Sequence, residues 1–354
     1  QRFAKSNDWR KWWCVTEDGV APRHLYFLGK DNIPFHTVIW PALIMGLNHA
    51  NNGLAEEDPI SLPGPGDLTL ETNVPAMEYL MLAGGQFSKS RKHAVWLPSF
   101  LERFDPDTLR YYLSINMPEN HDTDFNWPDF VAKINSELNG TYGNYVNRVM
   151  SLGNKLGGEN PLHIHDDLNQ CSEQMERLEQ IYVQITQSLN RHRYKEALRH
   201  VMSAAQYGNQ MLQKAVPWQY LAEPDPSDSS EYSDERGQSL SKLAFGWRLA
   251  RFLAITSHPF LPFSAQRLWT MIGQNGNVSD VLYESATDWS TPISWSNISQ
   301  PLFERLDLEA ILEHEQSLAQ SAPDTVHVDP GHGVKGTGKQ TKTEEEQEMS
   351  KAPE

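Results

Sequence analysis

The spacing of apolar residues changes near Trp127, and this change limits the possible folds more than any other feature of the chain. Before Trp127, residues 25–28 and 76–85 are short apolar runs typical of buried strands, whereas residues 36–48 have helical spacing with Pro41 near their start. This alternation of strand and helix patterns predicts the later part of a parallel α/β sheet.

After Trp127, apolar residues recur at the three- and four-residue spacing of amphipathic helices. The pattern predicts helices over residues 128–156, 168–189, 197–212 and 240–255, and a fifth, short helix after "HPFLPFSA". Successive amphipathic helices predict an α-helical bundle. The predicted fold class is therefore α/β followed by all-α.

Polar and acidic segments set the remaining boundaries. Residues 224–236 are typical of a loop between helices, and the chain from about residue 316 lacks periodicity, which predicts a disordered tail. Residues 98–116 carry two short helices, the second capped by Asp105. We therefore predict a first domain over residues 1–127, a helical domain over 128–315 and a tail over 316–354.

Composition narrows the class of protein. The net charge of −16 argues against a protein that coats nucleic acid through bulk charge. No run of about 18 or more apolar residues occurs, so we expect no membrane partner. The two cysteines, Cys14 and Cys171, form no CxxC pair. We therefore expect no zinc or other metal site and no disulfide framework, and a cytoplasmic location.

The segment FLGKDNIPFH, residues 27–36, joins the first expected strand to the first expected helix. Ligands of open α/β sheets bind beyond the carboxyl ends of strands, where Gly29 permits a close approach of the backbone. Asp31 can accept hydrogen bonds from an amine or from ribose hydroxyls, and His36 can line the same pocket. The same residues also fit a helix cap and a packed histidine, so the pattern alone leaves both interpretations open.

A second segment, GGQFSKSRKHAVW, places Ser88, Lys89 and Ser90 after a pair of glycines. Two hydroxyl donors and one ammonium group on a mobile loop suit a triphosphate whose charge shifts during a reaction. The residues FSKS also occur in ordinary solvated turns, so the segment alone predicts little.

The order of the motifs is more specific. "GKDNIPFH", followed by "VPAMEYLMLAGGQFSKSR" and "DPDTLRYYL", resembles methionyl-tRNA synthetase, a family of class I aminoacyl-tRNA ligases. "DTDFNWPDF", "GNYVNRV", "VPW" and "HPFLPFSA" continue the resemblance in order, over roughly residues 20–305. The FSKS form is similar to the archaeal and eukaryotic branch of the family.

The resemblance implies a Rossmann-like catalytic domain and methionine–tRNA ligase activity. In that reaction methionine and ATP, with Mg²⁺, give methionyl-adenylate, and the methionyl group then passes to methionine tRNA. The resemblance assigns Lys89 to the triphosphate and Ser88 and Ser90 to loop closure. The family signature usually begins with Lys where this chain has Gln86, so we expect a weaker grip on ATP with unchanged chemistry.

The GKD match implies a second set of ligand contacts. It places Gly29, Lys30 and Asp31 at ATP or at the methionine head group, and Asn32 and His36 at the methionine side chain. The family pocket typically has an apolar residue where this chain has Asn32.

The helical domain is similar to the anticodon-binding domain of the family. Asn144 and Arg148 lie four residues apart, on one helix face, and offer groups for base edges, while Trp218 offers a ring for stacking. The resemblance implies that these three residues read the CAU anticodon. Without it, the pattern is also typical of a wetted helix face and of a tryptophan that closes a core.

One motif of class I enzymes is missing, because no HIGH-type sequence occurs in the expected place. The chain begins at Gln1, and we expect the C-terminal part of a synthetase, with half a catalytic domain and a complete anticodon-binding domain, that is inactive alone. Two alternatives stay open: a non-catalytic tRNA-binding module, or another class I synthetase for an aliphatic amino acid.

Overall fold

The computed structural model describes residues 9–54, 59, 61–88, 93–222, 230–298 and 300–321, and the statements below concern these residues. The chain divides into two compact units, Gln1–Leu308 and Glu309–Glu354. The boundary expected after residue 127 falls inside the first unit, and the domain limits 1–127, 128–315 and 316–354 stay predictions.

The first part of the chain contains short parallel strand pairs. β1 (Leu28–Gly29) pairs with β2 (Ala76–Met77), and β3 (Leu80–Leu82) pairs with β4 (Thr123–Phe125). Parallel pairing agrees with the predicted α/β class, because strands of this kind are joined by helical crossovers. The helices here are α1 (Arg10–Trp13), η2 (Lys30–Asn32), η3 (Phe35–Ile39), α2 (Trp40–Asn51), α3 (Leu97–Arg103) and α4 (Pro106–Ile115).

The single strand expected over residues 76–85 is wrong, since β2 and β3 belong to different sheets. The backbone N–H of Glu78 donates to the carbonyl oxygen of Pro118 at 2.8 Å, and that of Tyr79 donates to the Asp122 carboxylate at 2.9 Å. These bonds replace ladder bonds to a neighbouring strand, so the extended chain leaves one sheet and enters the other.

The two short helices expected over residues 98–116 are confirmed as α3 and α4. The Asp105 side chain accepts the backbone N–H of Asp107 at 2.8 Å, as expected for an N-cap. Pro41 lies in the first turn of α2, which continues directly from η3. The predicted position of the Asp105 cap agrees with the observed start of α4.

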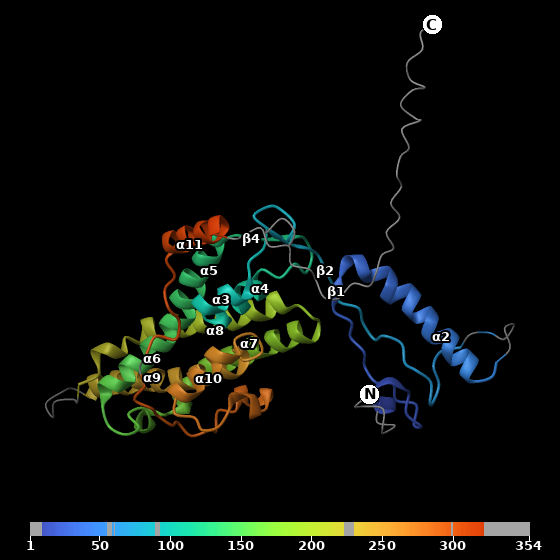
Figure 1. Ribbon diagram of the computed structural model, residues 1–354. Helices are drawn as coiled ribbons and strands as arrows, with labels where there is room; N and C mark the ends of the chain where they lie inside the picture. The colour runs from blue at the N-terminus through green and yellow to red at the C-terminus, as the bar shows by residue number, and fades with distance from the viewer. Residues whose placement is uncertain are drawn as a thin grey trace, which may run out of the picture. The chain divides into compact units, whose positions relative to one another are not determined.

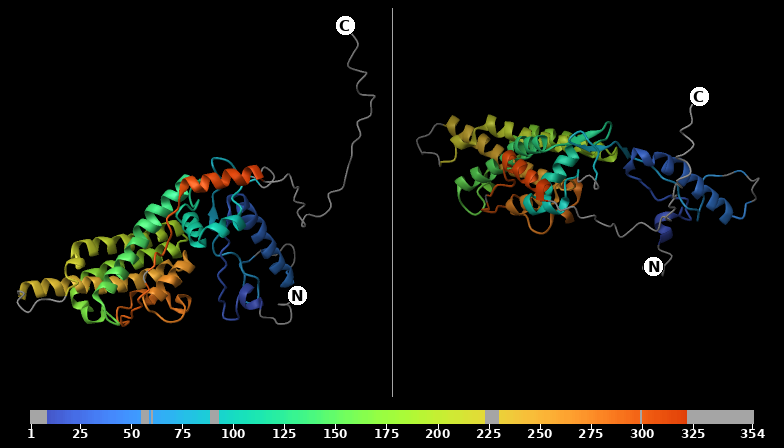
Figure 2. Two further views of the ribbon diagram at one scale, coloured as in Figure 1. Left: turned by 60° about the vertical axis from the view of Figure 1, so that its left-hand side comes forward. Right: turned by 45° about the horizontal axis from the view of Figure 1, so that its top comes forward.

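The second part is the predicted helical bundle (Figure 1). Helix α7 packs on α8, α8 on α9, and α9 on α10 and α6, and Figure 2 shows these helices running side by side. The elements are α5 (Trp127–Lys133), η4 (Ile134–Gly143), α6 (Asn144–Leu156), η5 (His163–His165), η6 (Leu168–Cys171), α7 (Ser172–Asn190), α8 (Tyr194–Ala215), η7 (Pro217–Gln219), α9 (Ser230–Ser257), α10 (Pro262–Met271), η8 (Val278–Asp280) and η9 (Tyr283–Thr287).

Two polar segments are more helical than expected. Helix α9 begins at Ser230, so the end of the loop expected over residues 224–236 is helical, and residues 223–229 lie outside the described part. Helix α11 (Leu308–Ser321) continues beyond residue 316, where we expected the tail to begin, and residues 322–354 lie outside the described part. Helices propagate cheaply once they are nucleated, so they extend past the last apolar residue of a pattern.

An aromatic core joins α3, β4 and α5. The rings of Phe100, Phe125 and Phe130 are fully or almost fully buried, and the Phe130 centroid lies 5.7 Å from that of Phe100 and 5.8 Å from that of Phe125. Because these rings come from both sides of Trp127, the α/β part and the start of the bundle share one core.

The turn between α7 and α8 provides a second connection to the α/β part. The Phe27 ring lies 5.3 Å from the ring of His192, centroid to centroid. The Glu119 carboxylate accepts the backbone N–H of Lys195 at 2.9 Å, and the Arg193 guanidinium donates to the Asn120 side chain at 2.7 Å. The first turn of α8 is thus held by residues near the strand ends.

Candidate functional site

The GKD turn follows directly after β1. Lys30 forms ion pairs with the carboxylates of Glu78 and Asp122, the latter at 3.2 Å, and its ammonium lies 4.4 Å from the centre of the Tyr79 ring. The hydrogen bond to Glu78 raises the pKa of Lys30, with a smaller contribution from Asp122. Lys30 is therefore paired with two acidic residues, and these ion pairs link the end of β1 to the starts of β3 and β4.

Three neighbours of Lys30 are exposed: Gly29, Asp31 and Asn32. The Asp31 carboxylate lies near the Tyr79 hydroxyl and raises the pKa of Tyr79. A carboxylate at the carboxyl end of a parallel strand can receive an amine or a ribose hydroxyl of a ligand.

His36 lies in an aromatic group with Tyr26 and Trp40. Its ring centroid is 5.7 Å from that of Tyr26, and the indole N–H of Trp40 donates to the Tyr26 hydroxyl at 3.2 Å. The Nδ1 atom of His36 is 3.1 Å from the carbonyl oxygen of Asn32. A carbonyl only accepts, so Nδ1 carries the proton and Nε2 is an acceptor in the neutral ring.

The FSKS segment is described only up to Ser88, and Lys89 and Ser90 lie outside the described residues. Ser88 and His93 exchange two backbone hydrogen bonds of 2.9 Å, which bring the two ends of the segment together. Before it, the N–H of Gly84, whose φ is +77°, donates to the Asp124 carboxylate at 2.8 Å. The glycine turn is therefore fixed to β4.

The structure brings Asn144, Arg148 and Trp218 together. The Arg148 guanidinium lies 5.5 Å from the centre of the Trp218 ring, which is 38% exposed. Asn144 and Arg148 begin α6 and project from the same side of it, as their spacing predicted. A partly exposed indole next to a guanidinium and an amide forms a platform on which an unpaired base can stack and be read at its edge.

Two further residues of α8 complete this surface. The Asn209 side-chain oxygen accepts from the Asn144 amide at 3.0 Å and from Arg148 at 3.4 Å, while its nitrogen donates to the Thr141 carbonyl oxygen at 2.9 Å. The Gln213 oxygen accepts from Arg148 at 3.4 Å. Sequence analysis missed both, although their four-residue spacing on the polar face of the helix before "VPW" was a usable signal.

Close packing sets the position of α6 against α8. A Cβ atom on Gly208 would lie 2.3 Å from the Tyr145 ring, which is fully buried and whose hydroxyl donates to the Gly246 carbonyl oxygen at 2.6 Å. Since Tyr145 follows Asn144 and Gly208 precedes Asn209, this contact brings the two polar side chains within hydrogen-bonding distance.

The end of α8 directs Trp218 to the same surface. Val216 has a left-handed backbone, with φ of 44° and ψ of 44°, which ends the helix. This conformation is uncommon for a β-branched residue and costs about 1–3 kcal/mol. Pro217 then starts the single turn η7, which carries Trp218.

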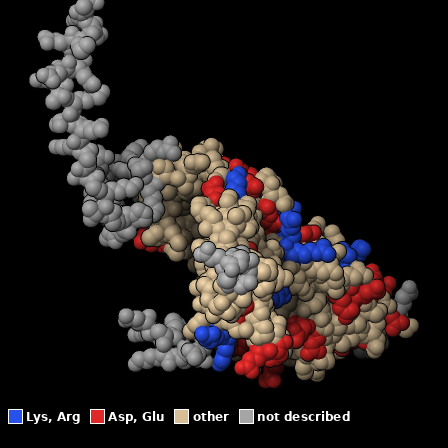
Figure 3. Space-filling model, turned by 90° about the vertical axis from the view of Figure 1, so that its right-hand side faces the viewer, with Lys and Arg blue, Asp and Glu red and all other residues tan. Residues whose placement is uncertain are grey.

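Positive charge is local on the face that Figure 3 shows, where Lys and Arg form small groups beside larger groups of Asp and Glu. Among the described residues, no helix is long and apolar enough to cross a membrane. In the same part of the chain, no group of three or more His, Cys, Asp or Glu side chains is placed to hold a metal ion.

Comparisons with known proteins identify the class. Residues 1–150 match the family model described as tRNA synthetases class I (M). Methionyl-tRNA synthetase of Mycobacterium tuberculosis, solved in complex with methionyl-adenylate, superimposes with a TM-score of 0.61 at 19% identity, over 86% of this chain and 52% of that chain. The fold is thus that of a class I aminoacyl-tRNA synthetase.

Similar sequences narrow the class to one family. The methionine–tRNA ligase of Roseiflexus sp. (strain RS-1) is 36% identical over 290 residues, which cover 81% of this chain and 44% of the relative. That of Pyrococcus abyssi (strain GE5 / Orsay) is 33% identical over 274 residues, which cover 77% of this chain and 35% of the relative. The chain is thus similar to methionine–tRNA ligases over about four fifths of its length, and it spans less than half the length of these relatives.

Proposed function

We propose that the chain supplies the signature-loop side of the nucleotide site and the anticodon-binding domain of a methionine–tRNA ligase. The observation that carries the proposal is the convergence of Asn144, Arg148 and Trp218 on one surface of a chain whose relatives are methionine–tRNA ligases. The enzyme would join methionine to its tRNA through methionyl-adenylate, at the expense of ATP.

In this proposal the first part of the chain binds ATP and methionine. Lys89, with Ser88 and Ser90, stabilises the triphosphate of ATP, which enters with Mg²⁺, as the methionine carboxylate attacks the α-phosphorus. Asp31 is placed, with Gly29, to receive the methionine amine or the ribose of ATP.

We propose different roles for the other three residues of the GKD segment. Lys30 positions the turn, because its ammonium pairs with the carboxylates of Glu78 and Asp122, which lie beyond the turn in the chain. His36 and Asn32 face the methionine side chain, and the Asn32 carbonyl fixes the proton of His36 on Nδ1.

The helical part reads the anticodon in the same proposal. One base of the CAU triplet stacks on Trp218, and Arg148 and Asn144 donate to or accept from its edge. Asn209 and Gln213 hold Arg148 in position through their side-chain oxygens. A cytoplasmic setting follows for an enzyme of translation, and the buried free thiols of Cys14 and Cys171 suit a reducing compartment.

Binding of this chain to tRNA tests the proposal. We expect methionine tRNA with the CAU anticodon to bind more tightly, at one stated salt concentration, than the same tRNA with one altered anticodon base. A mismatch in a base-reading site costs about 1–3 kcal/mol, so the altered tRNA should bind roughly 5- to 150-fold more weakly. Equal affinity for the two tRNAs would remove the anticodon from the proposal.

A further inference from the structure

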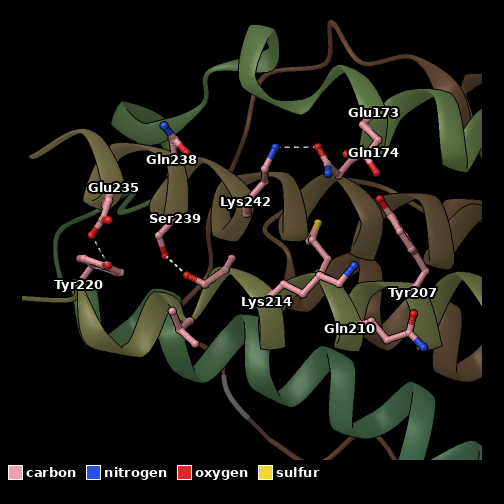
Figure 4. A pocket seen from close by; sticks show the side chains of 13 residues that line it. Glu173, Gln174, Tyr207, Gln210, Lys214, Tyr220, Glu235, Gln238, Ser239 and Lys242 are labelled. Carbon is pink, nitrogen blue, oxygen red and sulfur yellow. Dashed lines mark hydrogen bonds between the residues drawn. The ribbon is translucent and has the colours of Figure 1, made fainter. Parts of the chain in front are cut away.

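A cavity of about 370 Å³ lies between α7, α8 and α9, and it is lined by a different side of α8 from the side that carries Asn209. We call it the α8 pocket; its lining includes Tyr207, Gln210, Met211, Lys214, Tyr220 and Lys242 (Figure 4). Its volume is within the range of roughly 300–1,000 Å³ that is usual for small-ligand sites. Nothing in the function proposed above uses this cavity.

Some polar groups of the α8 pocket form hydrogen bonds with one another. Lys242 donates to the Gln174 side chain at 2.7 Å, and the Tyr220 hydroxyl donates to Glu235 at 3.1 Å. These bonds fix one wall of the pocket, and they hold the Tyr220 side chain in place.

Other polar groups of the pocket have no hydrogen bond or ion pair with any residue that the structure describes. They are two amides, one ammonium and one carboxylate: Gln210, Gln238, Lys214 and Glu173. Amides and carboxylates pair with the edges of bases, and an ammonium pairs with a phosphate. Tyr207 and Met211 add an aromatic wall and an apolar surface, as a nucleotide site requires.

The pocket and the Trp218 platform share the end of α8 and the residues that follow it. Residues 216–220 wrap around the end of α8, so that Val216 and Tyr220 line the pocket while Trp218 contacts Arg148. On α8 itself, Gln213 contacts Arg148 and its neighbour Lys214 lines the pocket. A strand of unpaired nucleotides that crosses the end of α8 therefore reaches both places.

We propose that the α8 pocket binds one unpaired nucleotide of the RNA whose neighbouring base stacks on Trp218. Gln210 and Gln238 pair with the edge of this second base, Tyr207 lies beside it, and Lys214 binds its phosphate. The inference rests on the proposed function, since it adds a second nucleotide subsite to the same RNA surface.

The test uses a hairpin RNA whose loop contains CAU, and fluorescence anisotropy with this chain at one salt concentration. Each loop nucleotide is made abasic in turn. With the unmodified chain, we expect two loop positions, no more than one or two nucleotides apart, at which loss of the base weakens binding about ten-fold, the scale of a lost base contact. In Gln210→Ala the penalty disappears at one position, and in Trp218→Ala it disappears at the other.

Two matched controls isolate the pocket. Gln206→Ala removes an exposed amide one turn earlier on α8, outside the pocket, and should leave both penalties unchanged. Lys214→Gln should make the affinity for the hairpin RNA less dependent on salt, by about the slope that one phosphate contact contributes. Lys133→Gln makes the same change in charge on α5 and should leave that slope unchanged.

The outcomes separate the two proposals. If Gln210→Ala and Lys214→Gln behave like their controls while Trp218→Ala still weakens binding, the α8 pocket is not a nucleotide site and the proposed function stands. If the unmodified chain shows no preference for the CAU loop and no abasic position matters, both proposals are wrong.

Discussion

At the scale of single residues, Trp218 is the most informative position for RNA binding. Its ring is partly exposed and lies against Arg148, so a base stacked on it gains both ring contact and a nearby cation. We expect Trp218→Ala to weaken RNA binding by about 1–3 kcal/mol. Trp96→Ala, at a tryptophan that is 50% exposed in the α/β part, is the control and should bind normally. Equal affinities of the two variants would contradict the stacking role.

Asp107 gives a prediction about pH. Its carboxylate is fully buried and accepts the N–H of Ser264, at the start of α10, at 2.6 Å. Burial raises the pKa of Asp107, even though the bond to Ser264 opposes the shift. The folded chain thus holds this proton to higher pH than the unfolded chain does. The contribution of Asp107 to stability is therefore full below the ordinary carboxylate pKa and falls as pH rises through the raised pKa.

The variant Asp107→Asn tests this sign, because the amide keeps an acceptor for Ser264 and does not ionise. We expect the free energy of unfolding of the unmodified chain, relative to that of Asp107→Asn, to fall as pH rises from acid towards neutral. Urea denaturation at several pH values measures both. Parallel pH profiles would mean that Asp107 ionises in the folded chain as it does in the unfolded one.

The sequence predicts which side chains lie together when those residues are close to each other along the chain. Asn144 and Arg148 share a helix face because they are four residues apart, and that spacing needs no tertiary information. Lys30 is different, because its partners Glu78 and Asp122 lie 48 and 92 residues further along the chain. No local pattern reveals such a pair, so the ion pairs of Lys30 could not be predicted from the sequence, and its contact with a ligand stays a prediction.

At the scale of elements, the contact between α6 and α8 is set by one glycine. A Cβ atom at Gly208 would overlap the buried ring of Tyr145, so α6 and α8 would have to move apart. We expect Gly208→Ala to lower the free energy of unfolding by about 1–3 kcal/mol, the usual cost of overpacking. It should also weaken RNA binding, because Asn209 would move away from Asn144 and Arg148.

Gly237→Ala is the matched control for this prediction. Gly237 lies inside α9, and an added Cβ atom meets no other atom within 4 Å. Alanine is favoured over glycine within helices by about 0.5–1 kcal/mol, so this variant should be neutral or more stable. Thermal or urea unfolding of both variants measures the difference. Similar losses in the two variants would show that the Tyr145 contact is not the cause.

Element boundaries show what periodicity can and cannot predict. The helices of the bundle follow from apolar spacing, because each buries one face against its neighbours. The break between β2 and β3 does not, since it depends on Pro118 and Asp122, which bond to Glu78 and Tyr79 from another part of the chain. The early start of α9 at Ser230 and the continuation of α11 to Ser321 were missed because polar helical turns have no apolar face.

At the scale of the first compact unit, α8 connects the two proposed sites. It has 22 residues, which span about 33 Å at a rise of 1.5 Å per residue. Its last turns carry Asn209 and Gln213. Its first turn is held by Glu119 and Asn120, two to three residues before Asp122, which binds Lys30. A continuous helix that is fixed at both ends transmits a gain in order from one end to the other.

This arrangement predicts where RNA binding should slow hydrogen exchange. In the unmodified chain, a CAU-loop hairpin should protect the last turns of α8 and also residues 119–122, because ordering of α8 strengthens the bond between Glu119 and the Lys195 N–H. In Glu119→Ala, protection of the last turns should persist while that of residues 119–122 is lost. Glu119→Gln keeps the acceptor and should behave like the unmodified chain. Exchange by mass spectrometry measures all three, and protection confined to the last turns of α8 in the unmodified chain would show that the helix does not couple the two sites.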